Sequence, residues 1–500
     1  MRLHNVSLLI VLAPAMLAAC TPLATHDNGT STWSNLPVAT TRVVNTEIDG
    51  AVRAYAPIGY SIAVMRRGNL VYSTYGGVAN LEFNVPMPDN AVFPIYSISK
   101  LFFNVAFLQL IEDGRVNPKL PLGAYLDGLP EAWRGITVHQ AWSHVSGLPD
   151  VVSPDGSAPA TQQEALDSVH DKPFVFPTGS ASQYNQTNFL LLKMILEKIV
   201  GEPYVQYVTR TQIEALGLKH TFFDQPYNWA ADKVSTYRAS TPGTPLMRLI
   251  VKIPSYLYLA GAMNATRQDL VTWWQAVLAG RFVKPETLQA HWRPMTHTDG
   301  SPAAFTDGWA VRSHNGFIRV GHDGAGIICL FHYFPEHDPA NSVTVIILSN
   351  GGRTEMNHHR LADLIADDLL PGVQTKEDRL TEAMVRRLAT GDWDGAVRLY
   401  RRYFDGADAG DDVRIAFLSS MSYEAYSWLG LKAALPVYQF AIDEFPHSAI
   451  PLRNMGYWHL TAGDLKDARA FFRRALEITP DDQQISGALA SVEARLRGTP

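Results

Sequence analysis

The hydrophobic and polar positions along this chain first follow an order typical of mixed α and β structure. Short runs rich in β-branched and aromatic residues, 61–65 and 70–75, flank a polar turn at 66–69 and predict a hairpin. Two longer apolar segments follow at 97–112 and 187–200. Their length and their leucine and phenylalanine content predict buried helices.

Further β-prone runs, separated by turn residues, occur at 318–320, 327–334 and 342–348 and predict antiparallel strands. Strands therefore come first, helices fill the middle and strands return. This order predicts an α+β fold rather than alternating βαβ units. Cys329 lies in the second of these runs, and we expect it to be a buried strand residue rather than a reactive thiol.

Beyond Pro371 the pattern becomes helical, and residues 376–500 predict a separate all-α domain. A spacing of small, aromatic, small and proline positions occurs there twice with a period of 34 residues: Ala434, Tyr438, Ala441 and Pro446, then Ala468, Phe472, Ala475 and Pro480. A further copy starts at Gly391. This spacing resembles the tetratricopeptide repeat, although an unrelated helical bundle is the alternative. Such repeats imply a protein partner, and so few copies imply docking on the preceding domain.

The start of the chain predicts export. Arg2 precedes an apolar stretch at 6–19 that is too short to span a bilayer. The stretch ends in Leu17-Ala18-Ala19-Cys20, which resembles a bacterial lipobox. The resemblance implies a lipoprotein signal peptide at 1–20 and lipid attached to Cys20, whereas a plain secretory signal is the alternative.

The residues after this signal are rich in Thr, Ser, Asn and Pro, so 21–42 predict a flexible tether. Thr21, rather than Asp, follows the lipobox cysteine. By resemblance to lipoproteins of Gram-negative bacteria, this implies a periplasmic protein anchored in the outer membrane. We expect the N-terminal lipid to be its only contact with the membrane.

Composition argues against several classes of function. The formal net charge is −6 and no basic patch stands out, so we do not expect nucleic acid as a partner. If Cys20 carries lipid, the other cysteine has no disulfide partner. No metal motif such as His-Glu-x-x-His occurs, and His358 and His359 are adjacent rather than four residues apart. We therefore expect no metal and no cofactor.

Candidate chemistry begins at Ser97 and Lys100, which lie three residues apart at the start of a predicted helix and so share one face. A serine hydroxyl is a weak nucleophile until a base removes its proton. A lysine acts as that base when burial and the positive end of a helix lower its pKa. Alone, the pair also fits a helix cap followed by a surface lysine.

Five separated segments make the match specific. In order, they are 75–82, 88–93 with the Ser97 segment after it, 143–149, 184–192 and 321–325. Together they resemble the class C β-lactamases and the related serine esterases and D,D-peptidases, over about residues 45–370. The resemblance implies a domain at 43–372 with the β-lactamase/transpeptidase-like antiparallel sheet flanked by helices.

The resemblance also implies roles for individual residues. Ser97 is acylated and Lys100 and Tyr184 move protons, with the pKa of Tyr184 lowered by nearby cations. The backbone N–H groups of Ser97 and Ala325 form an oxyanion hole. The residues implied to bind substrate are Gln186, His322 and Gly324.

Two positions depart from the family pattern. Gln186 replaces an asparagine, and His322 replaces a lysine, which predicts a weaker, pH-dependent positive charge for a substrate carboxylate. We expect a serine hydrolase that forms an acyl-enzyme with a small-molecule or peptide substrate, an ester, an amide or a β-lactam. The alternative is a catalytically silent envelope protein that binds a partner through its helical repeats.

Overall fold

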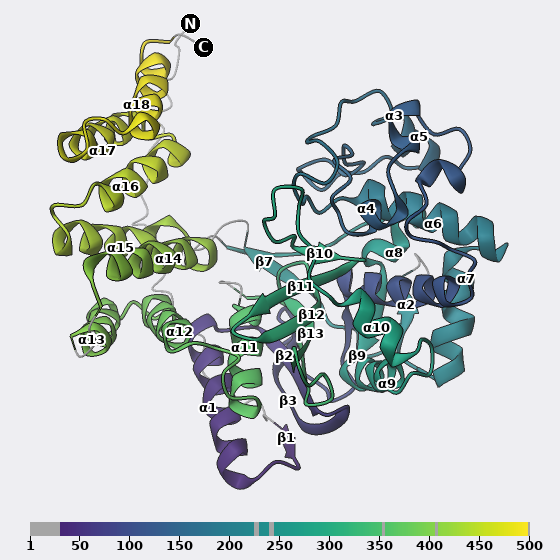
Figure 1. Cartoon of the computed structure of the whole chain (residues 1–500). Coiled ribbons are helices and arrows are strands. Elements are labelled where there is room, and N and C mark those ends of the chain that lie inside the picture. Colours follow the sequence, from purple (N-terminus) through teal and green to yellow (C-terminus); the bar gives the residue numbers. More distant parts are fainter. Residues whose placement is uncertain (1–30, 225–229, 240–244, 353–355, 406–408, 499–500) are drawn as a thin grey trace, which may run out of the picture.

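The computed structural model describes residues 31–224, 230–239, 245–352, 356–405 and 409–498 (Figure 1). The predicted signal peptide, the lipid site Cys20 and the first part of the predicted tether lie outside these residues. No helix in the described part of the chain is both long and apolar enough to cross a membrane.

Residues 31–42 were predicted to belong to a flexible tether, but they are ordered. Strand β1 (Ser31–Ser34) pairs with β3, and helix α1 (Val38–Tyr55) starts inside the predicted tether. The buried face of α1 carries Val44, Ile48 and Ala51, which are spaced by about one helical turn. This apolar stripe, packed on the sheet domain, gives the segment its fixed structure.

Among the described residues, nine strands form one antiparallel sheet in the order β1-β3-β2-β14-β13-β12-β11-β10, with β4 beside β3 (Figure 1). The remaining strands of this sheet are β2 Gly59–Arg66, β3 Asn69–Asn80, β4 Val85–Pro86, β10 Phe305–Thr306, β11 Trp309–His314, β12 Phe317–Gly324, β13 Ile328–Pro335 and β14 Val343–Ser349. The hairpin and the late strands predicted from the sequence are confirmed. Two small sheets hold β5 Val92–Pro94, β6 Phe222–Phe223 and β9 Met263–Thr266, and β7 Tyr237–Ala239 with β8 Leu246–Arg248.

Helices cover both faces of the large sheet, which explains why its central strands are apolar at successive positions. On β13, Leu330 belongs to the core shared with α2 (Ser99–Glu112) and α6 (Gln186–Val200), whereas Cys329 and Phe331 belong to the core beneath α1 and α11 (His358–Leu369). Cys329 is therefore buried, as predicted. The other helices of this domain are α3 Glu131–Arg134, α4 Val138–Trp142, α5 Gln162–Asp167, α7 Tyr204–Val208, α8 Tyr258–Gly261, α9 Arg267–Leu278 and α10 Pro285–His291.

The C-terminal region is a stack of paired helices that extends away from the sheet domain (Figure 1). Its helices are α12 Lys376–Ala389, α13 Trp393–Phe404, α14 Asp411–Leu429, α15 Leu431–Glu444, α16 Ala449–Ala462, α17 Leu465–Ile478 and α18 Gln483–Leu496. Phe472 on α17 is fully buried against Gly456 on α16, where an added Cβ would lie 2.7 Å from the phenyl ring. Small residues thus permit the close helix pairing that the repeat spacing predicts.

Buried polar contacts join this stack to the sheet domain. The Tyr55 hydroxyl donates to Glu382 on α12 at 2.9 Å. Arg360 on α11 forms ion pairs with Asp378 at 3.1 Å and with Glu424 at 2.9 Å. The expected docking of the repeats on the preceding domain is therefore present in the structure.

Candidate active site

Ser97 lies in a tight turn between β5 and α2. The preceding residue, Tyr96, has a left-handed φ of 43°, which is unusual for a bulky side chain. The turn is held from behind, because the N–H of Ile95 donates to the carbonyl of Met263 on β9 at 2.8 Å. Helix α2 then starts at Ser99, which places Lys100 beside Ser97 as the Ser-x-x-Lys spacing predicts.

Lys100 is completely buried, and its ammonium nitrogen donates to the carbonyl of Ala260 at 2.8 Å. The same nitrogen lies 4.8 Å from the centroid of the Tyr184 ring. Burial disfavours the charged form and lowers the pKa of Lys100 to about 7, while the nearby carboxylate of Asp150 opposes this shift. At neutral pH a large fraction of Lys100 is therefore an uncharged amine that can accept a proton.

Tyr184 donates a hydrogen bond from its hydroxyl to the Ser97 hydroxyl at 2.8 Å. Burial raises the pKa of Tyr184 well above its ordinary value, although hydrogen bonds with Ser97 and Gln186 act in the opposite direction. The expectation that nearby cations lower this pKa is wrong. The loss of water around a phenolate dominates, so Tyr184 is a protonated phenol in this structure.

His322 contacts the site from the end of β12. Its ring centroid lies 5.6 Å from that of Tyr184 and 5.9 Å from that of Phe305. Burial lowers the pKa of His322 to about 4, so the predicted positive charge near neutral pH is absent. Its Nδ1 lies 2.6 Å from the carbonyl oxygen of Asp323, which can only accept. Nδ1 therefore carries the proton and Nε2 is an acceptor, with no hydrogen-bond partner among the described residues.

Gly324 and Ala325 bring the end of β12 against the turn that holds Ser97. A Cβ at Gly324 would lie 2.8 Å from the carbonyl oxygen of Ile95, so only glycine permits this approach. Ala325 has a left-handed φ of 49°, and Arg238 donates to its carbonyl at 2.6 Å. The N–H groups of Ser97 and Ala325, the predicted oxyanion hole, thus belong to two segments packed against each other.

Gln186 stands at the first position of α6. Asn185, rather than Gln186, caps this helix, because its side chain accepts from the N–H of Asn188. The Gln186 side chain forms a hydrogen bond with Tyr184. Its Oε1 is buried and has no hydrogen-bond partner in the described part of the chain. The Oε1 atom is therefore available to accept a hydrogen bond from another group beside Tyr184.

Asp150 is a residue of the site that sequence reasoning missed. Its carboxylate accepts from the N–H of Gln186 at 3.1 Å and from the N–H of Val152 at 3.0 Å. It also acts on the charge of Lys100. Its place directly after the Gly147-Leu148-Pro149 segment was the available signal.

His144 supports Tyr184 from the same loop. Its Nδ1 accepts from the N–H of Asn185 at 3.0 Å, and its ring lies 4.8 Å from that of Tyr184. Burial holds the pKa of His144 well below its ordinary value. Because the imidazole of His144 is neutral, it adds no positive charge that would disfavour protonation of Lys100.

Comparison with known proteins identifies the class. The family model Beta-lactamase matches residues 44–370, and a Tetratricopeptide repeat model matches residues 431–492. The chain belongs to the β-lactamase family and carries tetratricopeptide repeats after its family domain. Protein Flp of Staphylococcus aureus strain N315 is 24% identical over 311 residues, which are 58% of this chain and 59% of Flp. The chain thus spans about three-fifths of the length of this curated relative.

Solved structures share the fold. The octameric penicillin-binding protein homologue from Pyrococcus abyssi has a TM-score of 0.57 and 21% identity, covering 69% of this chain and 81% of that one. The D-amino acid amidase from Ochrobactrum anthropi has a TM-score of 0.55 and 21% identity, covering 67% and 99%. The β-lactamase/D-alanine carboxypeptidase from Pseudomonas syringae has a TM-score of 0.54 and 17% identity, covering 68% and 100%.

Proposed function

We propose that this chain is a serine hydrolase that forms an acyl-enzyme at Ser97 with an ester or amide substrate. The hydrogen bond between Tyr184 and Ser97, next to a buried lysine whose pKa is lowered to about 7, is the observation that carries the proposal. Membership of the β-lactamase family supports it. Burying a charged amine without a carboxylate in direct contact destabilises a protein, so a lysine in such a place is a candidate for a functional role in its uncharged form.

In the proposed reaction, neutral Lys100 accepts the proton of Ser97 as Oγ attacks the carbonyl carbon. The N–H groups of Ser97 and Ala325 stabilise the negative oxygen of the tetrahedral intermediate. Tyr184 then gives its phenolic proton to the leaving alcohol or amine, and the Lys100 ammonium returns a proton to Tyr184. Water releases the acyl group by the same steps in reverse order.

We further propose that the substrate presents a hydrogen-bond donor, rather than a carboxylate, to His322. At neutral pH the imidazole is uncharged and Nε2 is an acceptor, which suits an amide N–H or an ammonium group. A lysine at this position would offer a permanent positive charge. Esters and amides of amine-bearing acids therefore fit better than a β-lactam with its carboxylate, and one fold neighbour is a D-amino acid amidase.

The cellular place of the protein is part of the proposal. The lipobox-like Leu17-Ala18-Ala19-Cys20 supports export and lipid attachment at Cys20, with anchoring in the outer membrane. Metabolic labelling with an alkyne fatty acid in a Gram-negative host tests it, with Cys20→Ala as the control. Labelling that persists in the variant, or no labelling of either protein, would exclude lipid at this cysteine.

The decisive test for hydrolysis compares the purified protein with Ser97→Ala. We expect p-nitrophenyl ester turnover and covalent labelling by a fluorophosphonate probe only in the protein with Ser97, with the probe mass found on the peptide that contains Ser97. A full panel of p-nitrophenyl esters and D-amino acid amides without turnover, and no labelling, would refute the proposal. The alternative, a silent envelope protein that binds a partner through its repeats, would then be favoured.

A further inference from the structure

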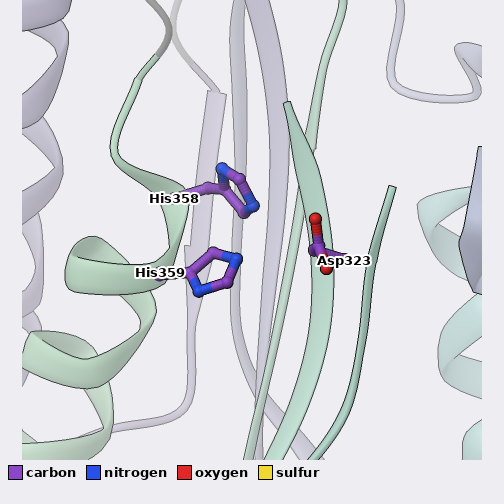
Figure 2. A group of neighbouring side chains, drawn as sticks. All are labelled: Asp323, His358 and His359. Atoms are coloured by element: carbon purple, nitrogen blue, oxygen red, sulfur yellow. The ribbon is translucent and has the colours of Figure 1, made fainter. Parts of the chain in front are cut away.

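Behind the strand that contributes His322 to the active site lies a second group of polar side chains. Residues on a strand alternate between faces, so Asp323 points away from His322 and Gly324. Its carboxylate faces the start of α11, where His358 and His359 are the first two residues (Figure 2). The carboxylate oxygen and one ring nitrogen from each histidine all lie within 4.8 Å of one another.

From this juxtaposition we infer a binding site for a divalent transition-metal ion of the zinc type, with Asp323, His358 and His359 as its protein ligands. Two imidazole nitrogens and one carboxylate oxygen are the donor set that such ions prefer. Donor atoms of a tetrahedral zinc site lie about 3.4 Å apart. Metal binding would therefore require side-chain rotations that bring the three donor atoms from within 4.8 Å of one another to this spacing.

The hydrogen bonding of His358 suits metal binding. Its Nδ1 lies 3.3 Å from the carbonyl oxygen of Met356, which can only accept, so Nδ1 carries the proton and Nε2 has a free lone pair. The Nε2 atom of His358 is buried and accepts no hydrogen bond from any described residue. A metal ion would satisfy this lone pair.

Asp323 would supply the negative charge of the metal site and its opening to solvent. Among the described residues, no lysine or arginine forms an ion pair with its carboxylate, and its nearest ionic contact is His322 at 3.9 Å. The Asp323 side chain is 37% exposed, which leaves room for water as the fourth ligand. The neighbouring Cys329 is not part of this group of donors, and its sulfur donates to the carbonyl of His358 at 3.8 Å.

This ion would act on structure rather than on acyl transfer, since it lies on the opposite face of β12 from the reacting groups. The carbonyl of Asp323 accepts from His322, and its carboxylate would bind the metal, so one residue connects the two sites. The histidine rings also pack against Trp428 on α14, with centroid distances of 6.0 and 6.3 Å. The proposed ion thus stands where the active-site strand, α11 and the repeats meet.

The site was not evident from the sequence. His358 and His359 lack a helical ligand spacing, and Asp323 is 35 positions before the first of them. Only the fold brings the three residues together.

Cobalt and zinc titrations of the full-length protein, purified in detergent and stripped with EDTA, test the inference. We expect one Co²⁺ per chain, with the visible absorption of a four-coordinate site that is bleached by Zn²⁺. His359→Gln and Asp323→Asn each weaken binding at least about tenfold. His337→Gln, which changes an exposed histidine elsewhere, leaves binding unchanged.

Absence of a stoichiometric Co²⁺ spectrum in the unmodified protein would overturn the inference, as would equal affinity in His359→Gln and Asp323→Asn. Circular dichroism establishes that each variant is folded. If Asp323→Asn fails to fold, His359→Gln decides alone, and Zn²⁺ must then raise the Tm of the unmodified protein and of His337→Gln but not of His359→Gln. Because the readout is metal binding, the result does not depend on the proposed hydrolysis.

Discussion

The hydroxyl of Tyr184, a half-buried residue, lies 2.8 Å from the hydroxyl of Ser97, and the neighbouring Lys100 is fully buried. Burial acts on these two groups in complementary ways. It keeps the tyrosine protonated and makes the lysine a base near neutral pH. The pair therefore places one proton donor and one proton acceptor beside Ser97, as the proposed reaction requires.

Replacing Tyr184 by phenylalanine removes the proposed donor to the leaving group and keeps the ring. We expect kcat/KM for an amide substrate to fall about 10²–10⁴-fold, the range typical of a lost general acid. A p-nitrophenyl ester should lose less, because p-nitrophenolate leaves without a proton whereas an amine leaves only when protonated. Tyr423→Phe, at an exposed tyrosine of the repeats, is the matched control. Equal turnover in Tyr184→Phe would remove Tyr184 from the mechanism.

The pH profile should report on Lys100. Only the neutral amine accepts a proton, and its fraction grows as pH rises through the lowered pKa of about 7. We therefore expect kcat/KM to rise by up to about tenfold per pH unit below pH 7 and to level off above it. Steady-state ester kinetics between pH 5.5 and 9 measure this. Lys100→Gln should lose both the activity and the rise, and a profile that falls across this range would contradict the assignment.

Gly324 is a sharp test of the approach between β12 and the turn that holds Ser97. In Gly324→Ala the new Cβ would lie 2.8 Å from the carbonyl oxygen of Ile95 and from the Ile328 side chain. The strand end must move, and the N–H of Ala325 moves with it. We expect at least a tenfold loss of kcat/KM, since a lost oxyanion-hole donor costs about 10²–10³-fold.

Gly135→Ala is the matched control for this substitution, because an added Cβ would meet no atom within 4 Å apart from its chain neighbours and the φ of −79° suits alanine. Both variants should remain folded by circular dichroism. Unchanged kinetics in Gly324→Ala would show that Ala325 does not need this position for catalysis.

A buried carboxylate between two histidines should make stability depend on pH. Asp307 lies 2.6 Å from Nδ1 of both His139 and His291, and its N–H donates to Ser143 in the loop that supports Tyr184. The hydrogen bond to Asp307 raises the pKa of His139 above its ordinary 6.5. Its contribution is thus complete below pH 6.5 and is lost as pH rises through the raised pKa.

Thermal unfolding of the unmodified protein and His139→Gln from pH 5.5 to 8.5 checks this contribution. The Tm advantage of the unmodified protein should be largest at pH 5.5 and should shrink toward pH 8.5. It should not vanish, because a neutral histidine still donates to Asp307. An advantage that grows with pH would contradict the stated sign.

The sequence identified the parts of the site that lie close together along the chain. Ser97 and Lys100 share one helical turn, and the continuous apolar runs of β13 and β14 were sufficient to predict both strands. The predictions that were wrong concern properties that depend on contacts with distant segments of the chain. The neutrality of His322 comes from burial by Tyr184 and Phe305, which no local pattern contains. Helix α1 was missed because its polar start resembles a linker, although its apolar stripe was present.

The contact between α1 and α12 should contribute strongly to the stability of the whole chain. Glu382 is 2% exposed and accepts from Tyr55 at 2.9 Å and from Arg386 at 2.8 Å. Removing the carboxylate in Glu382→Ala leaves the partly buried Arg386 with Glu47 as its remaining ion-pair partner. We expect the free energy of unfolding to fall by about 3 kcal/mol, the lower end for a broken buried ion pair.

Urea denaturation followed by tryptophan fluorescence measures the loss. Glu477→Ala, at an exposed position of α17, should stay within about 0.5 kcal/mol of the unmodified protein. If both variants unfold at the same urea concentration, the contact does not hold the repeats to the sheet domain.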